Sequence, residues 1–129
     1  MTLAVLDASA LLALLRAEPG QERVRAVVAD AAMTAVNLGE VVGHLARNGG
    51  AEDDIRRILD PLPFDRVPFG EELAYLAGLL LPATRAAGLS FGDRACLALV
   101  RQLGIKGLTA DRAWLSVEEA VGVEIELIR

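Results

Sequence analysis

Short apolar runs alternate with longer helix-like segments along the whole chain, and this alternation restricts the fold more than any other feature. The runs typical of strands cover residues 3–6, 32–35, 64–67, 106–109 and 123–127. The segments with helical patterns cover residues 8–16, 21–29, 36–47, 52–59, 71–87, 91–103 and 112–119. Strands that alternate with helices predict an α/β fold whose mostly parallel sheet is covered by helices on both faces.

The length and composition limit the kind of protein further. A chain of 129 residues without linker or repeat is predicted to form a single domain over residues 1–129. One cysteine excludes a disulfide framework and a cysteine-based zinc site, and one histidine excludes the two-histidine metal motifs. The net charge of -5 argues against binding of nucleic acid by a broad basic surface.

Membrane insertion and export are not expected from the sequence. The longest apolar run, residues 73–83, is well short of the roughly 20 residues that a membrane-spanning helix needs. No basic leader precedes the first apolar run, and Asp7 interrupts that run at once. We therefore expect a soluble cytoplasmic protein that does not engage a membrane.

Four carboxylates fall near the predicted carboxyl edge of the sheet, where ligands of open α/β sheets bind. Asp7 directly follows the first strand, and Asp111 comes two residues after the fourth. Glu40 lies in the first turns of the helix after the second strand. Asp93 lies in the first turn of the helix that begins after residues 88–90.

Each carboxylate also has a purely structural explanation. Asp7 and Asp111 could cap the helices that follow them, and Ser90 with Asp93 forms the pattern of a capping box. Glu40 could be a solvated residue near a helix start. Taken together, however, clustered carboxylates repel one another unless a proton or a cation neutralises them. An oxygen-only set suits Mg²⁺ or Mn²⁺, which in such sites polarises a phosphoryl group and activates water.

The helix predicted at residues 36–47 places Glu40 on its polar face. Asn37, Glu40, His44 and Arg47 lie on one side, opposite the apolar residues. His44 could support Glu40 or act as a general base, but a surface histidine paired with Glu40 is the interpretation that we favour.

Four segments together resemble the PIN-domain ribonucleases, and specifically the VapC-type toxins of bacterial toxin–antitoxin pairs. Their order and spacing agree over nearly the whole chain, and the third segment is the most specific. The segments are Val5-Leu6-Asp7-Ala8-Ser9-Ala10, Asn37-Leu38-Gly39-Glu40-Val41, Gly88-Leu89-Ser90-Phe91-Gly92-Asp93-Arg94-Ala95-Cys96 and Leu108-Thr109-Ala110-Asp111-Arg112-Ala113-Trp114.

The resemblance implies a three-layer α/β/α sandwich on a five-stranded sheet with strand order 3-2-1-4-5. It implies an endoribonuclease in which one or two Mg²⁺ or Mn²⁺ ions activate water for hydrolysis of a phosphodiester. The residues that would hold the ions are Asp7, Glu40, Asp93 and Asp111, of which Asp111 occupies the position that the family varies most. Ser9 and Thr109 match hydroxyls that support the acidic cluster.

The resemblance also implies partners: an RNA substrate, a VapB-like antitoxin and a second copy of the chain in a homodimer. Arg94 and Arg112, which follow two of the aspartates, could contact RNA or be ordinary surface arginines. The high mean hydropathy of +0.41 suggests apolar surface for a partner, although the same residues could form the core. The residues concerned are Ala10, Leu11, Leu14, Leu15, Leu79, Leu80 and Leu81.

Other functions remain alternatives at this point. A PIN nuclease of RNA processing rather than a toxin, or a PIN-like domain used only for binding, would share the fold; such binding domains usually lose acidic positions. A haloacid-dehalogenase-type phosphatase would need a second aspartate where Ser9 stands. A receiver domain would need a lysine after a late strand, whereas Lys106 precedes its strand.

Overall fold

The computed structural model describes all residues from Met1 to Arg129, and its centre is one five-stranded sheet. The strands are β1 (Ala4–Leu6), β2 (Ala31–Thr34), β3 (Asp65–Val67), β4 (Lys106–Thr109) and β5 (Ile125–Leu127). Their order is β3-β2-β1-β4-β5, and all four neighbouring pairs are parallel. The predicted α/β class and strand order are therefore confirmed, and β1 lies beside β4 at the centre of the sheet.

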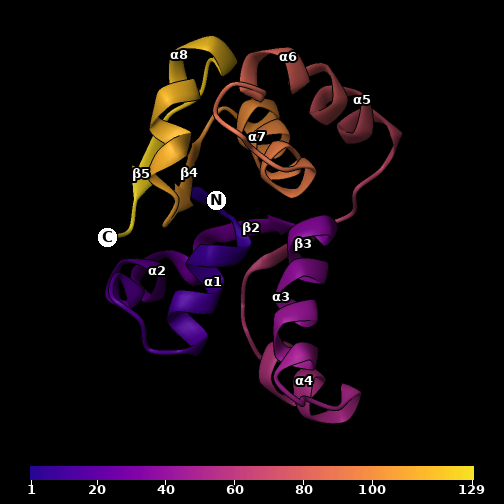
Figure 1. Ribbon diagram of the computed structural model, residues 1–129. Coiled ribbons are helices and arrows are strands. Elements are labelled where there is room, and N and C mark those ends of the chain that lie inside the picture. Colours follow the sequence, from indigo (N-terminus) through magenta and orange to yellow (C-terminus); the bar gives the residue numbers. More distant parts are fainter.

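Helices lie on both sides of this sheet, which makes the molecule a three-layer sandwich (Figure 1). The α-helices are α1 (Ala8–Leu15), α2 (Gln21–Val27), α3 (Ala35–Arg47), α4 (Glu52–Leu59), α5 (Glu71–Leu79), α6 (Leu81–Thr84), α7 (Phe91–Leu103) and α8 (Glu118–Val121). Two 3₁₀ helices, η1 (Val28–Asp30) and η2 (Arg112–Val117), complete the chain. Helices α1 to α4 cover one face of the sheet, and α5 to α8 with η2 cover the other.

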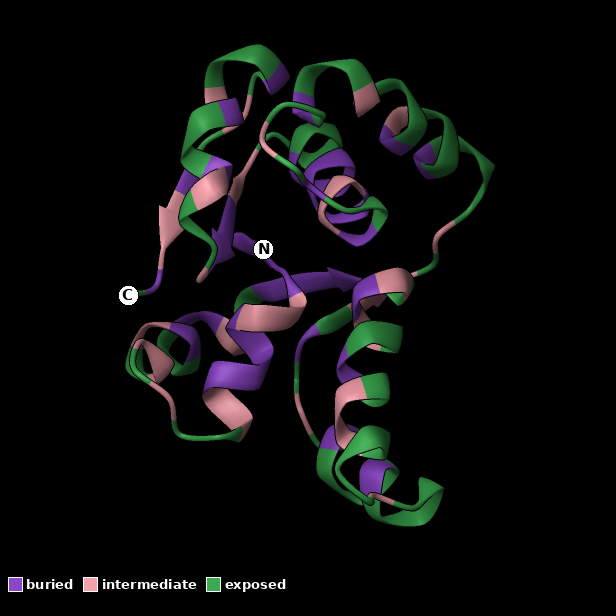
Figure 2. Ribbon diagram, in the orientation of Figure 1, coloured by how far each residue is buried: buried purple, intermediate pink, exposed green.

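The two faces of the sheet carry separate hydrophobic cores, because successive side chains of a strand point to opposite faces. In β1, Ala4 and Leu6 pack into the core beneath α1 to α4, whereas Val5 packs into the core beneath α5 to α8. Figure 2 shows the buried residues gathered on the strands, on α1 and on the inner side of α7. Cys96 and Trp114 are both buried in the core beneath α5 to α8.

The prediction of one long helix over residues 71–87 is wrong, because the structure divides this segment into α5 and α6. Pro82 explains the division: proline has no N–H to donate to the carbonyl four residues earlier, and its ring clashes with that carbonyl in a helix interior. Pro82 instead occupies the first turn of α6, where it is tolerated. The segment 112–119 winds first as a 3₁₀ helix and becomes α-helical only at Glu118.

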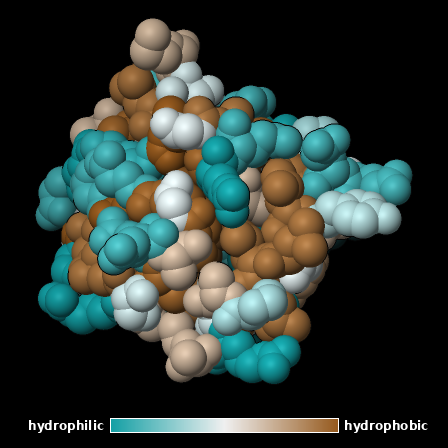
Figure 3. Space-filling model, turned by 90° about the horizontal axis from the view of Figure 1, so that it is seen from above, coloured by the Kyte–Doolittle hydropathy of each residue, from teal (hydrophilic) through white to brown (hydrophobic).

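Most of the apolar residues considered for a partner surface belong to the core. Ala10 and Leu11 are fully buried, Leu80 is buried, and Leu14 and Leu15 pack against the core. Leu79 differs, because it is 73% exposed on α5 close to Tyr75, which is 67% exposed. Seen from above, this side of the molecule shows hydrophobic surface interspersed with polar side chains (Figure 3). No helix is both long and apolar enough to cross a bilayer.

A cluster of charged side chains joins the carboxyl-terminal strand to the rest of the sheet. Glu126 of β5 accepts two hydrogen bonds from Arg23 of α2, and its other contact is Lys106 of β4 at 2.9 Å. The Arg23 guanidinium and the Lys106 ammonium together lower the pKa of Glu126 to about 2. The cluster therefore fixes α2 against the edge of the sheet.

Candidate active site

Asp7, at the end of β1, is held by three hydrogen bonds. Its Oδ1 accepts hydrogen bonds from the Ser9 hydroxyl (2.7 Å) and from the Ala10 N–H (2.8 Å), so it caps α1. Its Oδ2 accepts from the Thr109 hydroxyl at the end of β4 (2.6 Å). The Thr109 bond exists because β1 and β4 are neighbours, and the three bonds together fix the side chain in one position.

The charge of Asp7 has no positive partner in the protein. Its side chain is buried, and burial raises the pKa of Asp7 to about 6, although the Thr109, Ser9 and Ala10 hydrogen bonds act in the opposite direction. The nearby Asp93 raises the pKa slightly further. None of the five ion pairs of the chain includes Asp7, so this carboxylate is one that a cation would stabilise.

Glu40, on α3, is held by Asn37 one turn earlier. The Asn37 amide donates to Glu40 Oε1 (2.8 Å) and to the carbonyl of Gly92 in the first turn of α7 (3.0 Å). Oδ1 of the Asn37 side chain accepts a hydrogen bond from the Thr34 hydroxyl (2.7 Å). The Thr34 hydroxyl in turn caps α3 by accepting a hydrogen bond from the backbone N–H of Asn37. Asn37 is only 1% exposed, so one buried amide connects the end of β2, the Glu40 carboxylate and the start of α7.

Gly92 leaves the space that the Glu40 carboxylate occupies. A Cβ atom built on Gly92 would lie 2.2 Å from Glu40 Oε2 and 2.6 Å from its carboxyl carbon. Real Cβ atoms do not approach other atoms so closely, so the Glu40 carboxylate can occupy this position against α7 only with glycine at position 92. Gly92 is therefore a packing requirement of the Glu40 position.

Asp93 and Asp111 each use one oxygen for a local structural bond. Asp93 Oδ2 accepts from the Ser90 N–H (2.8 Å), and the Ser90 hydroxyl accepts from the Asp93 N–H, which completes the predicted capping box. Asp111 Oδ1 accepts from the Ala113 N–H (2.9 Å) and caps η2. The second oxygen of each carboxylate accepts no hydrogen bond from the protein. Each aspartate can therefore keep its cap and still offer an oxygen to a ligand.

All four predicted carboxylates line one cavity of about 350 Å³, which we call the acidic cavity. Its other lining residues are Ala8, Ser9, Leu12, Arg16, Glu18, His44 and Arg129. As the side chains stand, no group of three or more His, Cys, Asp or Glu residues is placed to hold one ion. The donor set is nevertheless all oxygen and contains one buried, uncompensated carboxylate, which is the chemistry that fits a hard divalent cation.

The basic residues singled out in the sequence behave differently from one another. Arg94 is half-buried, donates to the Leu89 carbonyl (3.0 Å) and does not line the acidic cavity. Arg112 is exposed beside Asp111. The expected pairing of His44 with Glu40 is not formed, because the His44 ring bonds Arg47 instead, with 2.9 Å between Nδ1 and Arg47 Nη2. Contact of Arg94 and Arg112 with RNA stays a prediction.

Three residues of the site are not predicted from the sequence: Thr34, Asn37 and Gly92. Asn37 is expected on the same helix face as Glu40, and its spacing of three residues could have indicated a hydrogen bond between them. Nothing in the sequence indicates that Gly92 faces Glu40, because this contact joins helices that are far apart along the chain.

The sequence matches the PIN domain family over residues 4–120, which is most of the chain. The chain therefore belongs to the PIN-domain family, whose members are in general nucleases that use divalent metal ions. No curated protein sequence matches the chain.

Several solved structures with the same fold are VapBC toxin–antitoxin proteins. A chain of the DNA-bound VapBC from Salmonella typhimurium matches with a TM-score of 0.78 at 13% identity, covering 100% of both chains. A chain of VapBC2 from Rickettsia felis, bound to a promoter DNA fragment, matches with a TM-score of 0.75 at 12% identity over 98% of both. VapBC-5 from Mycobacterium tuberculosis, a member of the VapBC family of toxin–antitoxin systems, matches with a TM-score of 0.64 at 19% identity. The match covers 100% of this chain and 99% of that one. At these identities, the likeness is one of fold.

Proposed function

We propose that this PIN domain, formed by residues 1–129, is a Mg²⁺- or Mn²⁺-dependent endoribonuclease that acts as the toxin of a toxin–antitoxin pair. The observation that carries the proposal is the acidic cavity, where Asp7, Glu40, Asp93 and Asp111 gather without a basic partner in any ion pair. Carboxylates gathered in this way favour a cation, and RNA then meets a neutralised site. Membership of a nuclease family supports the same reaction class.

In the proposed reaction, water adds in line to a phosphorus atom, the bond to O3′ breaks, and the products carry 5′-phosphate and 3′-hydroxyl ends. A bound divalent ion supplies charge stabilisation for the phosphoryl oxygens and a lowered pKa for water. Asp7, Glu40, Asp93 and Asp111 would hold one or two such ions. Glu40, Asp93 and Asp111 are not buried, so binding of an ion would have to be accompanied by rotation of these side chains.

The supporting residues of the chain keep the donors in position. The Ser9 and Thr109 hydroxyls fix both oxygens of Asp7, and the Asn37 amide fixes one oxygen of Glu40. Donors that are already fixed need little reorganisation when charge develops in the transition state, which is the main source of electrostatic catalysis.

The reaction is tested by incubating the purified chain with tRNA and rRNA in Mg²⁺, in Mn²⁺ and in EDTA. We expect cleavage with either ion, loss of cleavage in EDTA and recovery when the ion is restored. Asp93→Asn should lower the cleavage rate at least about 100-fold, because a charged oxygen donor is removed from the site. Asp65→Asn, an exposed aspartate of β3, serves as the matched control and should cleave normally. Cleavage that persists in EDTA or in Asp93→Asn would contradict the mechanism.

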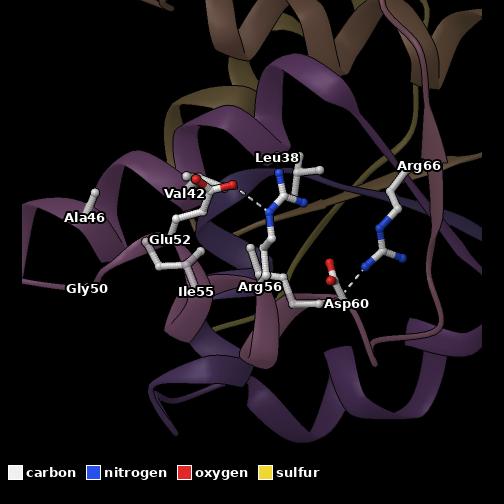
Figure 4. A pocket seen from close by; sticks show the side chains of 10 residues that line it. Leu38, Val42, Ala46, Gly50, Glu52, Ile55, Arg56, Asp60 and Arg66 are labelled. Atoms are coloured by element: carbon white, nitrogen blue, oxygen red, sulfur yellow. Dashed lines mark hydrogen bonds and ion pairs between the residues drawn. The ribbon is translucent and has the colours of Figure 1, made fainter.

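For the partner, we propose a VapB-like antitoxin that places an apolar helix in the groove between α3 and α4. The groove has a volume of about 460 Å³ and is lined by Leu38, Val42, Ala46, Gly50, Glu52, Ile55, Arg56, Leu59, Asp60 and Arg66. Figure 4 shows apolar side chains along its floor and the Glu52–Arg56 ion pair at its edge. An apolar floor with a charged rim is typical of sites that bind an amphipathic helix. The VapBC complexes among the fold neighbours support a partner of this kind.

The groove is tested with a candidate antitoxin, for which a small protein encoded directly beside this gene would be chosen. Val42→Asp places a charge in the apolar groove, so we expect binding, measured by calorimetry, to weaken at least about 10-fold. Ile58→Asp is the control, because Ile58 is an exposed apolar residue of α4 outside the groove. Equal losses for both variants, or none for Val42→Asp, would place the partner elsewhere.

A homodimer remains part of the proposal, and Tyr75 and Leu79 of α5 are the exposed side chains that support it. Sedimentation of the purified chain measures its oligomeric state directly.

The tests also decide between the alternative functions. If the chain cleaves RNA but has no antitoxin, it is a nuclease of RNA processing. If it shows no metal-dependent cleavage, it is a PIN-like domain used only for binding. The toxin proposal requires that the chain act on RNA in the cytoplasm.

A further inference from the structure

Two arginines beside the acidic cavity have no acidic partner. The five ion pairs of the chain use Arg23, Arg56, Arg57, Lys106 and Arg129. Arg16, at the end of α1, is exposed, lines the acidic cavity and makes no side-chain hydrogen bond. Arg47, at the end of α3, is exposed and bonds only the His44 ring. Both guanidinium groups are therefore free to bind an anion.

A second hollow lies beside the acidic cavity on α3. It has a volume of about 250 Å³ and is lined by Glu40, Gly43, His44 and Arg47, with no hydrophobic residue among them. Glu40 and His44 line both hollows, so the two are adjacent. Gly43 contributes no side chain to the second hollow, and the space beside it is open, with nothing within 4 Å of a Cβ atom built at this position. The space is polar and accessible, as the path of a phosphate backbone must be.

The bond between His44 and Arg47 defines which nitrogen of the histidine carries the proton. A guanidinium group only donates, so His44 Nδ1 must accept from Arg47 Nη2. The neutral ring then carries its hydrogen on Nε2 and presents a donor. This arrangement makes His44 a donor to an oxygen atom and leaves it without the free lone pair that a general base needs.

We propose that Arg16 on one side and the His44–Arg47 pair on the other bind the phosphates that flank the cleaved bond of a single-stranded RNA. The inference rests on the proposed nuclease function and deepens it. The strand would run from the end of α1 across the acidic cavity to the hollow beside α3. Arginine and a histidine N–H are donors that match phosphate oxygens. Binding through a few phosphates also agrees with a chain of net charge -5, which offers no broad basic surface.

The binding test uses the full chain with Asp93→Asn, which prevents cleavage, and a fluorescently labelled single-stranded RNA followed by anisotropy at several KCl concentrations. Arg16→Gln and Arg47→Gln should each weaken binding about 5- to 10-fold near 0.1 M salt. Each should also reduce the slope of log K against log salt by about 0.7, the value for one neutralised phosphate of a single strand. The control, Arg85→Gln, removes the same charge from an exposed arginine outside both hollows and should bind like the parent.

His44 is tested by cleavage kinetics in the otherwise unaltered chain. His44→Phe removes the Nε2 donor and should raise KM about 5- to 10-fold with kcat within about 3-fold of the parent, whereas His44→Gln, which retains an amide donor, should raise KM less than His44→Phe does. A general base would instead show itself as a loss of about 100-fold or more in kcat in both variants.

The outcomes separate this inference from the proposed function. If the chain cleaves RNA but Arg16→Gln and Arg47→Gln bind like Arg85→Gln, the inference is overturned and the nuclease proposal stands. If binding depends on both arginines but no cleavage occurs with any metal ion, the phosphate-binding role stands and the nuclease proposal fails. Absence of RNA binding, or tighter binding of duplex RNA than of single strands, would overturn the inference.

Discussion

Asp7→Asn is expected to make the metal-free protein more stable at neutral pH while it slows RNA cleavage at least about 100-fold. In the chain, burial raises the pKa of Asp7 from 3.8 to about 6. A raised carboxyl pKa means that the folded state gains stability when Asp7 is protonated. This gain is complete below about pH 4 and is lost as the pH rises through 6. At pH 7, the buried charge therefore costs about 3 kcal/mol of folding free energy.

Asparagine removes this charge and can keep the hydrogen bonds. Its Oδ1 can accept from the Ala10 N–H and the Ser9 hydroxyl, as Asp7 Oδ1 does. Its amide group would face the Thr109 hydroxyl, which can turn its own hydrogen toward Ser9, 3.4 Å away. This rearrangement costs part of the gain, so we expect an increase in unfolding free energy of about 1–3 kcal/mol in EDTA.

The measurement is thermal or urea unfolding of Asp7→Asn and the parent at pH 4 and pH 7 in EDTA, repeated at pH 7 with Mn²⁺. The difference should be present at pH 7 and nearly absent at pH 4. Mn²⁺ should stabilise the parent more than Asp7→Asn, because the stabilisation by a ligand that binds the folded state rises with the logarithm of its affinity. A destabilised Asp7→Asn protein in EDTA at pH 7 would contradict this account of the site.

The parts of the site that sequence could predict are those set by local chemistry. Asp7 and Asp111 follow strands whose apolar runs are readable, and Ser90 with Asp93 forms a capping box within four residues. The same residues serve as caps and line the acidic cavity, so the capping interpretation is confirmed, and their role in catalysis stays a prediction. Local patterns cannot separate the two interpretations, because one oxygen of a carboxylate can cap a helix while the other is open to a ligand.

The parts that could not be predicted depend on contacts between distant segments. Asn37 matters because its amide reaches the Gly92 carbonyl, which requires the packing of α3 against α7. His44 bonds Arg47 rather than Glu40, a choice between two neighbours on one helix that only the side-chain geometry decides. The break at Pro82 is different, because the helix-breaking effect of a proline in a helix interior is visible in the sequence itself.

Gly92→Ala is expected to reduce RNA cleavage about 100-fold without removing any functional group, since a displacement of about 1 Å at a reacting centre can cost this much. The added methyl group would lie 2.2 Å from Glu40 Oε2, so either the carboxylate rotates away or α7 moves from α3. Rotation of the carboxylate breaks the Asn37 hydrogen bond to Glu40, and displacement of α7 stretches the Asn37 hydrogen bond to the Gly92 carbonyl. We also expect the free energy of unfolding to fall by about 1–3 kcal/mol, as in other overpacked sites.

The control for this prediction is Gly78→Ala on α5, where an added Cβ meets nothing within 4 Å. Alanine is favoured over glycine in an exposed helix, so Gly78→Ala should be stabilised by up to about 1 kcal/mol and should cleave RNA normally. Opposite stability changes for the same substitution in two helices would isolate the contact with Glu40 as the cause. Glu40→Gln combined with Gly92→Ala gives the final distinction. If Gly92 acts only through the Glu40 carboxylate, the double variant should be hardly slower than Glu40→Gln alone, whereas additive losses would show that α7 itself positions the other carboxylates.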